Sequence, residues 1–283
     1  GFSSDGAECN SDIYNNQFYY VAGHIGGSTY ILKVDSRTGD TLWTRETNLT
    51  SNFVYVKRCV LTANAGCVFT GKAKYAFALK LDSAGNIVWN KIYNDYDVDV
   101  QHIIKLSDGN YLMCGITGFE AGVIIKIDKD GNKIWSRTHN FSTRTRYFSV
   151  VEQNLKYYFI GAIQSTNTKV LFSTTDTSGN NPVYNTYNFL NTNESGLAIT
   201  TMSNGFIIMC NTNLGAYMVK VNNLGVVQYG KFVPEGNGEQ RGYRYFRGNI
   251  YISYIIPGTN QDSVHNKLLV LDTLGNLIRS KVF

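Results

Sequence analysis

The chain has 283 residues, of which 43% are apolar and 17% are charged, so it can bury a core and does not have the composition of a disordered chain. No apolar run approaches the roughly 18 residues of a transmembrane helix, and a net charge of +5 is milder than the concentrated positive charge of a dedicated nucleic-acid binder. Three prolines beside 27 glycines, 20 tyrosines and 15 phenylalanines favour many short strands joined by glycine turns over a helical protein.

One sequence pattern recurs six times along the chain. Its clearest copies are ILKVDSRTGDTLWTR from Ile31, ALKLDSAGNIVWNK from Ala78 and IIKIDKDGNKIWSR from Ile124. Weaker copies begin at Leu171, Met218 and Leu268. The turn glycines follow one another at intervals of 46 to 50 residues: Gly39, Gly85, Gly131, Gly179, Gly225 and Gly275. The repeats therefore account for the whole of this sequence and leave no room in it for a second domain.

Each copy is predicted to form four antiparallel strands. In the third copy these are 100–106, 111–117, 122–128 and 133–139, with Asp-Gly turns closing the first and third hairpins. The second strand recurs at 18–23, 67–71, 157–162, 206–211 and 250–254. Four strands in a repeat of about 40 to 50 residues are typical of a propeller blade. We therefore expect an all-β fold, a six-bladed β-propeller without long helices, as one domain over 1–283 with blades near 7–46, 54–93, 98–139, 146–187, 196–232 and 240–283.

An aromatic residue occupies one position in the last strand of most copies. Tryptophan holds it in the first three copies and tyrosine in the fifth: Trp43, Trp89, Trp135 and Tyr229. Tyr184 lies one residue late in the fourth copy, and Arg279 takes the position in the sixth. We predict that these rings pack on the neighbouring blade. An Asp or Asn before each turn is predicted to bind the turn's own amides and not calcium: Asp35, Asp82, Asp128, Asp176, Asn222 and Asp272.

Two columns of basic residues accompany the aromatic position. One follows it by two residues and consists of Arg45, Lys91, Arg137, Lys231 and Lys281. The other lies in the third strand and consists of Lys33, Lys80, Lys126 and Lys220. Because the outer strands of blades are sheet edges, we interpret both columns as charges that discourage aggregation between edges.

Five cysteines are too few for a dense disulfide framework, and without a CxxC pair they do not predict a zinc site. Cys114 and Cys210 hold the same position in two second strands, which favours small buried side chains. Cys9, Cys59 and Cys67 are the disulfide candidates. A three- or five-residue turn would bring Cys59 and Cys67 to one face, whereas a two-residue turn would place them on opposite faces.

Three N-glycosylation sequons begin at Asn48, Asn140 and Asn193. All three fall in the connection from the last strand of one blade to the first strand of the next, and these connections are expected to share one face. The chain also begins with Gly, as a processed product would. These features predict a secreted, extracellular glycoprotein.

The pair DGNYLMCGITG and GVIIKIDKDGNKIWSRT, within 108–138, resembles the repeats of secreted β-propeller proteins. The segment VDSRTGDTLW (34–43) is also similar to the tryptophan-docking motif of pyrroloquinoline-quinone enzymes, which have eight blades where this chain has six repeats. The resemblance implies the fold and export. It does not imply a function, because propellers host enzymes, lectins and scaffolds, and we expect no cofactor and no metal.

The leading functional hypothesis is a non-enzymatic binding or assembly module, possible partners being a protein, a glycan or further copies of the chain in an extracellular filament or coat. The first alternative is a glycan-binding lectin built on aromatic residues such as Tyr30, Phe77 and Tyr217. Nucleic-acid binding is not expected, and no residue is assigned a catalytic role.

The second alternative is an enzyme with its site at the mouth of the central channel. Its candidates are the four arginines of the connections before the fourth and sixth blades, which would hold an anionic substrate: Arg144, Arg146, Arg241 and Arg244. His102 lies near Asp95, Asp97 and Asp99 in the sequence, but we interpret this group as a solvated loop and not as an acid–base pair.

Overall fold

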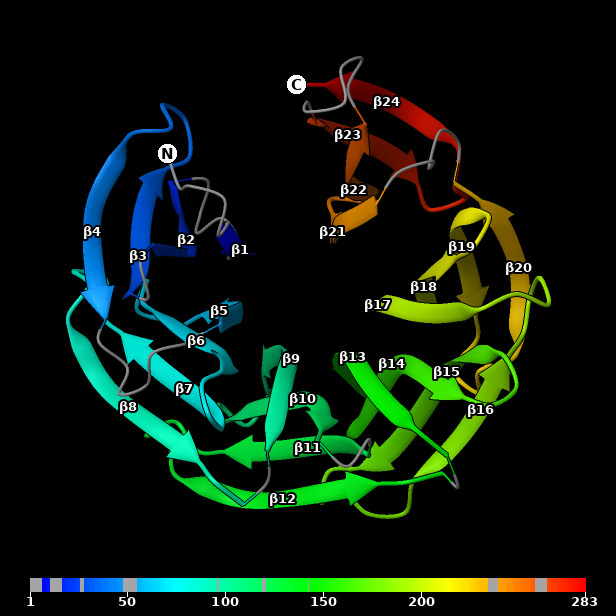
Figure 1. Cartoon of the computed structure of the whole chain (residues 1–283), viewed down its shortest axis with the longest axis horizontal. Coiled ribbons are helices and arrows are strands. Elements are labelled where there is room, and N and C mark those ends of the chain that lie inside the picture. Colours follow the sequence, from blue (N-terminus) through cyan, green and yellow to red (C-terminus); the bar gives the residue numbers. More distant parts are fainter. Residues whose placement is uncertain are drawn as a thin grey trace. The chain divides into compact units, whose positions relative to one another are not determined.

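The computed structural model describes residues 7–10, 17–25, 28–47, 55–95, 97–118, 121–141, 143–233, 239–257 and 264–283. The strands β1 to β24 form six four-stranded antiparallel sheets, each a meander of strands consecutive in the sequence. The chain is therefore a six-bladed β-propeller, which confirms the fold predicted from its repeats (Figure 1). Within the described ranges, we find no helix with the length and apolar character needed to cross a membrane.

The chain divides into two compact units, the first made of residues 1–140 and 145–152. It contains the first three blades. Their strands are β1 (Ala7–Asn10), β2 (Phe18–Ile25), β3 (Ser28–Asp35) and β4 (Thr41–Thr47); β5 (Tyr55–Leu61), β6 (Cys67–Lys72), β7 (Ala76–Leu81) and β8 (Ile87–Tyr93); and β9 (Val98–Lys105), β10 (Tyr111–Thr117), β11 (Gly122–Ile127) and β12 (Lys133–His139).

The second unit is made of residues 141–144 and 153–283. The fourth sheet is opened by β13 (Thr145–Gln153), most of which belongs to the first unit. The remaining strands are β14 (Lys156–Gln164), β15 (Thr168–Asp176) and β16 (Val183–Tyr187); β17 (Glu194–Met202), β18 (Gly205–Thr212), β19 (Gly215–Val221) and β20 (Val227–Phe232); and β21 (Glu239–Phe246), β22 (Asn249–Pro257), β23 (Val264–Asp272) and β24 (Leu277–Val282).

The core lies between neighbouring blades. In the first unit, Tyr20 and Ile31 of the first blade pack with Phe69 and Leu79 of the second, and all four are at most 1% exposed. A second cluster joins the second blade to the third, and a third cluster joins the fifth blade to the sixth. In each of these three clusters one sheet buries a face against the next, and the last strand of each sheet is largely exposed.

A β-bulge recurs at one place in the first strand of the blades. One residue there has no partner on the second strand, and these extra residues are Glu8 in β1, Lys57 in β5, Gln101 in β9, Leu197 in β17 and Arg241 in β21. In two blades a glycine of the second strand faces the bulge. A Cβ atom on Gly71 would lie 1.8 Å from the carbonyl oxygen of Tyr55, and one on Gly115 would lie 2.2 Å from that of Asp99. Glycine thus admits the backbone that bulges toward it.

Candidate functional site

The turn between the third and fourth strands of each blade is held by its own Asp or Asn. Asp82 illustrates the arrangement: its Oδ1 accepts hydrogen bonds from the amides of Ala84 and Asn86, and its Oδ2 accepts one from the Asn86 side chain. These bonds lower the pKa of the Asp82 carboxyl below its usual value. Gly85 completes the turn with a φ of +85°. The carboxylate oxygens are engaged by the turn itself, as an Asx turn requires.

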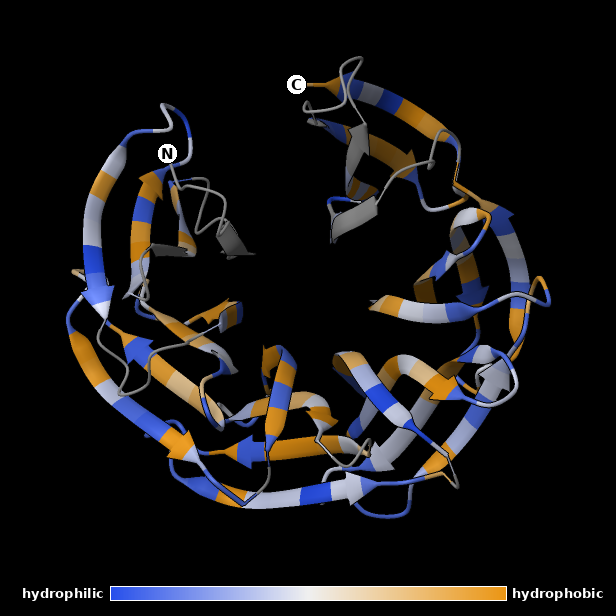
Figure 2. Cartoon of the chain, viewed as in Figure 1, coloured by the Kyte–Doolittle hydropathy of each residue, from blue (hydrophilic) through white to orange (hydrophobic). Residues whose placement is uncertain are grey.

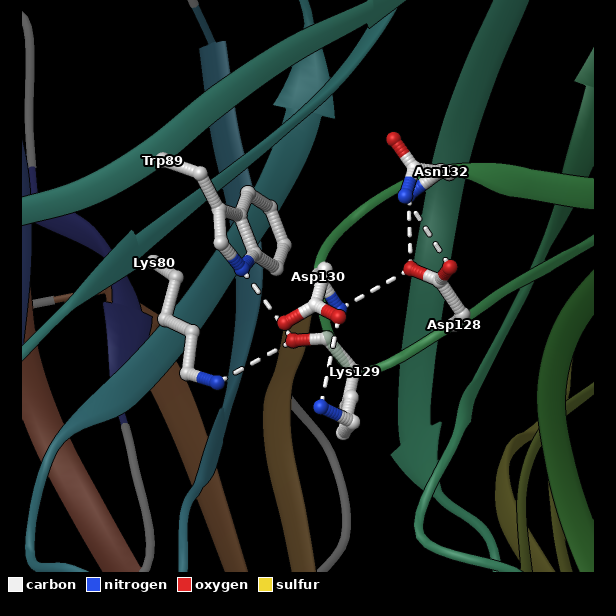
Figure 3. A network of polar contacts seen from close by, with 6 residues as sticks. All are labelled: Lys80, Trp89, Asp128, Lys129, Asp130 and Asn132. Carbon is white, nitrogen blue, oxygen red and sulfur yellow. Dashed lines mark hydrogen bonds and ion pairs between the residues drawn. The ribbon is translucent and has the colours of Figure 1, made fainter.

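The turns of the second, third, fifth and sixth blades are also bound by the blade before them. Lys33 Nζ and Trp43 Nε1 both donate to the carbonyl oxygen of Ser83, at 2.9 and 3.2 Å. One blade later, Lys80 Nζ and Trp89 Nε1 donate to the carbonyl oxygen of Lys129, at 3.1 and 3.2 Å. Figure 3 shows Lys80 and Trp89 reaching Lys129, which lies within the Asx turn formed by Asp128 and Asn132.

The basic residues two positions after the aromatic column complete the contact. Arg45 Nε donates to the carbonyl oxygen of Gly85 at 2.9 Å, and Lys231 Nζ donates to Asn276 Oδ1 at 2.7 Å. Tyr229 uses its hydroxyl in place of an indole and donates to the carbonyl oxygen of Thr273. For Arg45 and Lys231 our interpretation as edge charges was therefore incomplete, because both bind the next blade's turn.

The fourth blade departs from the pattern. Val183 takes the place opposite the third strand that tryptophan holds in earlier blades. Tyr184 instead stacks on Phe141, with ring centroids 4.1 Å apart and an interplanar angle of 27°.

In the third blade, the guanidinium of Arg137 lies 5.4 Å from the Trp135 ring centroid, a cation–π distance.

The cysteine candidates lie in the first two blades. A five-residue connection between β5 and β6 puts Cys59 and Cys67 on one face, but Cys59 lies opposite Phe69 and Cys67 opposite Leu61. This diagonal register separates their Cβ atoms by more than a disulfide spans, and the structure does not join the two cysteines. The side chain of Cys9 lies outside the described residues. Cys114 and Cys210 are buried.

Two of the three sequon asparagines lie in the described ranges. Asn140 follows β12 and Asn193 precedes β17, and both are exposed. Asn193 Oδ1 accepts a hydrogen bond from the Thr168 amide at 2.9 Å, which leaves its Nδ2 atom directed elsewhere. Asn48 lies outside the described residues.

Three of the four arginine candidates lie in strands, whereas Arg144 lies in the connection before the fourth blade, as predicted. Arg146 is within β13, Arg144 directly precedes it, and Arg241 and Arg244 are within β21. Arg144 and Arg146 are half-buried, and the side chains of the other two lie outside the described residues. The carbonyl oxygen of Arg144 accepts a hydrogen bond from Gln164.

Two of the three carboxylates near His102 in the sequence are bound elsewhere. Asp97 forms an ion pair with Lys72 at 2.8 Å, and Asp95 pairs with Lys133. His102 itself is in β9, which agrees with the strand predicted over 100–106 and corrects the interpretation of this group as a solvated loop. Its Nδ1 atom accepts a hydrogen bond from the Val150 amide at 3.3 Å.

Two of the aromatic candidates for a sugar site are used in packing. Phe77 is 1% exposed within the core between the first two blades. Tyr217 lies between Phe189 and Phe232, with ring centroids 5.6 and 5.1 Å away. Tyr30 is half-buried.

A second set of β-bulges, in the outer strands, was missed by the sequence analysis. The residue before the aromatic position has no partner on the third strand, and we call this set the outer bulge column: Leu42, Val88, Ile134, Gln228 and Ile278. Its four apolar side chains are 48 to 56% exposed. Figure 2 shows hydrophobic segments on β4 and β8 among hydrophilic neighbours. Single exposed apolar side chains are ordinary on a protein surface, but these four recur at one position of the repeat.

No protein-family model matches the chain, and no curated protein matches its sequence. Solved structures do match. A protein of unknown function from Bacteroides caccae has a TM-score of 0.65 at 13% identity, with 94% of each chain covered. The Dos1 propeller has a TM-score of 0.59 at 12% identity, covering 99% of this chain and 73% of that one. The dihydro-heme d1 dehydrogenase NirN has a TM-score of 0.58 at 12% identity, covering 97% of this chain and 56% of that one. At such identities the likeness shows the propeller fold alone.

Proposed function

We propose that this chain is a non-enzymatic binding or assembly module that is exported from the cell and associates with further copies of itself through its outer strands. The observation that carries the proposal is the outer bulge column. Burying the exposed half of one such Leu, Val or Ile would stabilise a complex by about 1 kcal/mol.

The mode of contact follows from the bulges. A bulge interrupts the regular row of backbone donors and acceptors at a sheet edge and so hinders pairing with a strand from another molecule. It also places its own side chain outward, at the same position in successive blades. Contact through apolar side chains is therefore favoured over addition of a strand. A partner whose contacts repeat with the same blade spacing fits such a surface, and a second copy of the chain has that spacing.

The free energy available from burying these side chains predicts weak association between two copies of the chain. Leu42, Val88 and Ile134 together supply about 3 kcal/mol, whereas association itself costs on the order of 4–15 kcal/mol in lost freedom of motion. A single contact of this kind is short-lived. Repeated contacts in a filament or coat would add their contributions and raise the overall affinity.

Replacing the three apolar residues of the column in the first unit tests the proposal. The triple variant Leu42→Asn, Val88→Asn, Ile134→Asn is expected to remain a monomer at concentrations where the wild-type chain forms larger species, measured by sedimentation velocity across a concentration series. The matched control is Leu155→Asn, Leu214→Asn, Leu224→Asn, three loop residues that are 67 to 78% exposed. A wild-type chain that is monomeric throughout, or a control that loses association equally, would count against the proposal. If the wild-type chain stays monomeric but binds a different protein, and the triple variant loses that binding, a hetero-complex is favoured.

Export is tested by measuring whether the native protein carries N-linked glycans. Material purified from its native source is expected to lose mass on glycosidase treatment, and Asn140→Gln is expected to remove one glycan because Asn140 is exposed in a connection between blades. Intact-mass spectrometry reads both results. Asn181→Gln, an exposed asparagine outside any sequon, should leave the mass of the glycans unchanged. Native protein with no change of mass would remove this support for an extracellular location.

A further inference from the structure

Three leucines and a valine of the second unit stand in hairpin turns and are exposed to water. Leu155 lies between β13 and β14, Leu224 and Val226 lie between β19 and β20, and Leu274 lies between β23 and β24. In that order the four residues are 76, 78, 58 and 58% exposed. Each therefore keeps most of an apolar side chain in water, which costs free energy.

These turns lie at one end of their sheets. In the four-stranded meanders of this unit (Figure 1), the first and third connections fall at one end and the second at the other. Gln153 Nε2 donates to the Met202 carbonyl at 3.2 Å, which joins the first hairpins of the fourth and fifth blades. Lys231, which follows the last turn of the fifth blade, donates to Asn276 in the last turn of the sixth. The four apolar residues therefore belong to the same side of the second unit.

The turns themselves do not require leucine. The amides of Leu224 and Leu274 donate to the Asx side chain that opens each turn, at 2.9 and 2.8 Å, and nearly any residue supplies such an amide. Small or polar residues hold the same place in the second to fourth blades: Ala84, Asp130 and Ser178. Leu155 has a φ of +56°, which leucine adopts at a cost and which Asn or Gly accepts more readily. Turn chemistry thus explains neither the identity of these leucines nor their exposure.

Two cations accompany the apolar residues. Lys156 follows Leu155 and is exposed, and Arg247, in the first hairpin turn of the sixth blade, is exposed as well. The carboxylates in the last turns of the fourth and sixth blades, Asp176 and Asp272, accept hydrogen bonds from their own turns. The last turn of the fifth blade, which carries the most exposed leucine of the set, has no charged side chain.

We infer that this end of the second unit binds the surface of a lipid bilayer, with the leucines among the acyl chains and the two cations beside anionic headgroups. The leucines stand on separate turns, and the neighbouring turn at 203–204 is polar. A protein partner would need a fitted pocket for each leucine, whereas fluid acyl chains accept each one where it lies. Lysine and arginine at the same level add attraction to anionic lipid. This surface differs from the outer bulge column and does not depend on the proposed assembly.

Flotation of the full chain with large unilamellar vesicles tests the inference, at protein concentrations where the chain is monomeric. The vesicles hold about two parts phosphatidylcholine to one part phosphatidylserine. Leu224→Asn is expected to weaken partitioning about tenfold, because its side chain, 78% exposed in water, no longer enters the acyl region. The matched control is Leu214→Asn, a leucine that is 67% exposed in the second turn of the fifth blade, at the opposite end, and it should bind as the wild type does. A wild-type chain that stays behind when the vesicles float, or equal losses in the two variants, would overturn the inference.

Two further variants separate the apolar and the charged contributions. Leu155→Asn is expected to weaken partitioning about tenfold as well, yet to melt no lower than the wild type, because Asn accepts the φ of +56°. Lys156→Gln is expected to weaken binding to the mixed vesicles about fivefold and to leave binding to pure phosphatidylcholine unchanged. Equal losses on both kinds of vesicle would contradict attraction to anionic lipid. If the leucine variants retain vesicle binding and lose self-association in sedimentation instead, the turns contact a second copy and the lipid inference fails.

Discussion

Replacing Gly71 with alanine is expected to lower the free energy of unfolding by about 3 kcal/mol. The new Cβ atom would lie 1.8 Å from the carbonyl oxygen of Tyr55 and 3.0 Å from the Cα atom of Val56. Both are backbone atoms, so no side-chain rotation relieves the overlap, and β5 must shift as a whole. Chemical denaturation of the variant and the wild-type chain measures the difference.

The control for this change is Gly39→Ala. Gly39 has a φ of +79°, but no atom lies within 4 Å of its added Cβ. Its replacement carries only the cost of the left-handed backbone, about 1–2 kcal/mol. Equal destabilisation by the two substitutions would show that the bulge of β5 is free to flatten and that Gly71 is not required for it.

Replacing Trp89 with alanine is expected to cost about 3 kcal/mol. The indole packs on Gly131 of the next blade, where an added Cβ would lie 2.9 Å from the ring, and its Nε1 donates to the Lys129 carbonyl. Because the ring is half-buried, we place the effect at the lower end for a tryptophan. Thermal and chemical denaturation at concentrations that keep the chain monomeric measure it.

Two further variants separate the contributions of the ring. Trp89→Phe keeps an aromatic surface on Gly131 and loses the hydrogen bond, so a cost of about 1 kcal/mol is expected. Val88→Ala changes the adjacent residue, which is 54% exposed, and should alter stability by no more than about 0.5 kcal/mol. A Trp89→Ala variant as stable as Val88→Ala would refute the packing of one blade on the next through this column.

The sequence predicted the features that depend on side chains at a fixed spacing. The Asp of each turn, the glycine after it and the aromatic residue on the last strand all recur at one interval, and Trp43 and Trp89 contact the next blade as expected. The partners of the basic columns could not be found in this way. Lys33 and Lys80 bind carbonyl oxygens, which every residue carries, so nothing in the next repeat identifies the acceptor.

The bulges were hidden for a different reason. A bulge changes the register by one residue, and the residues that take the extra place, such as Lys57, Gln101 and Leu197, share no side-chain chemistry. In the outer strands, Val88 and Ile134 have the β-branched side chains of ordinary strand residues, so alternation alone does not mark them as exposed. The placement of His102 between two blades depends on this register as well.

Most of the bonds described from one blade to the next turn end on backbone carbonyl oxygens, and this has a consequence for how such a chain can change over time. The bonds donated by Lys33, Trp43 and Tyr229 do not depend on which side chain the acceptor residue carries, provided that the turn keeps its path, whereas the bond from Lys231 requires Asn276. Substitutions can accumulate in one repeat without compensating changes in the next. Three closely similar repeats and three weaker ones can therefore share one architecture, because these bonds require the path of the next turn and not its side chains.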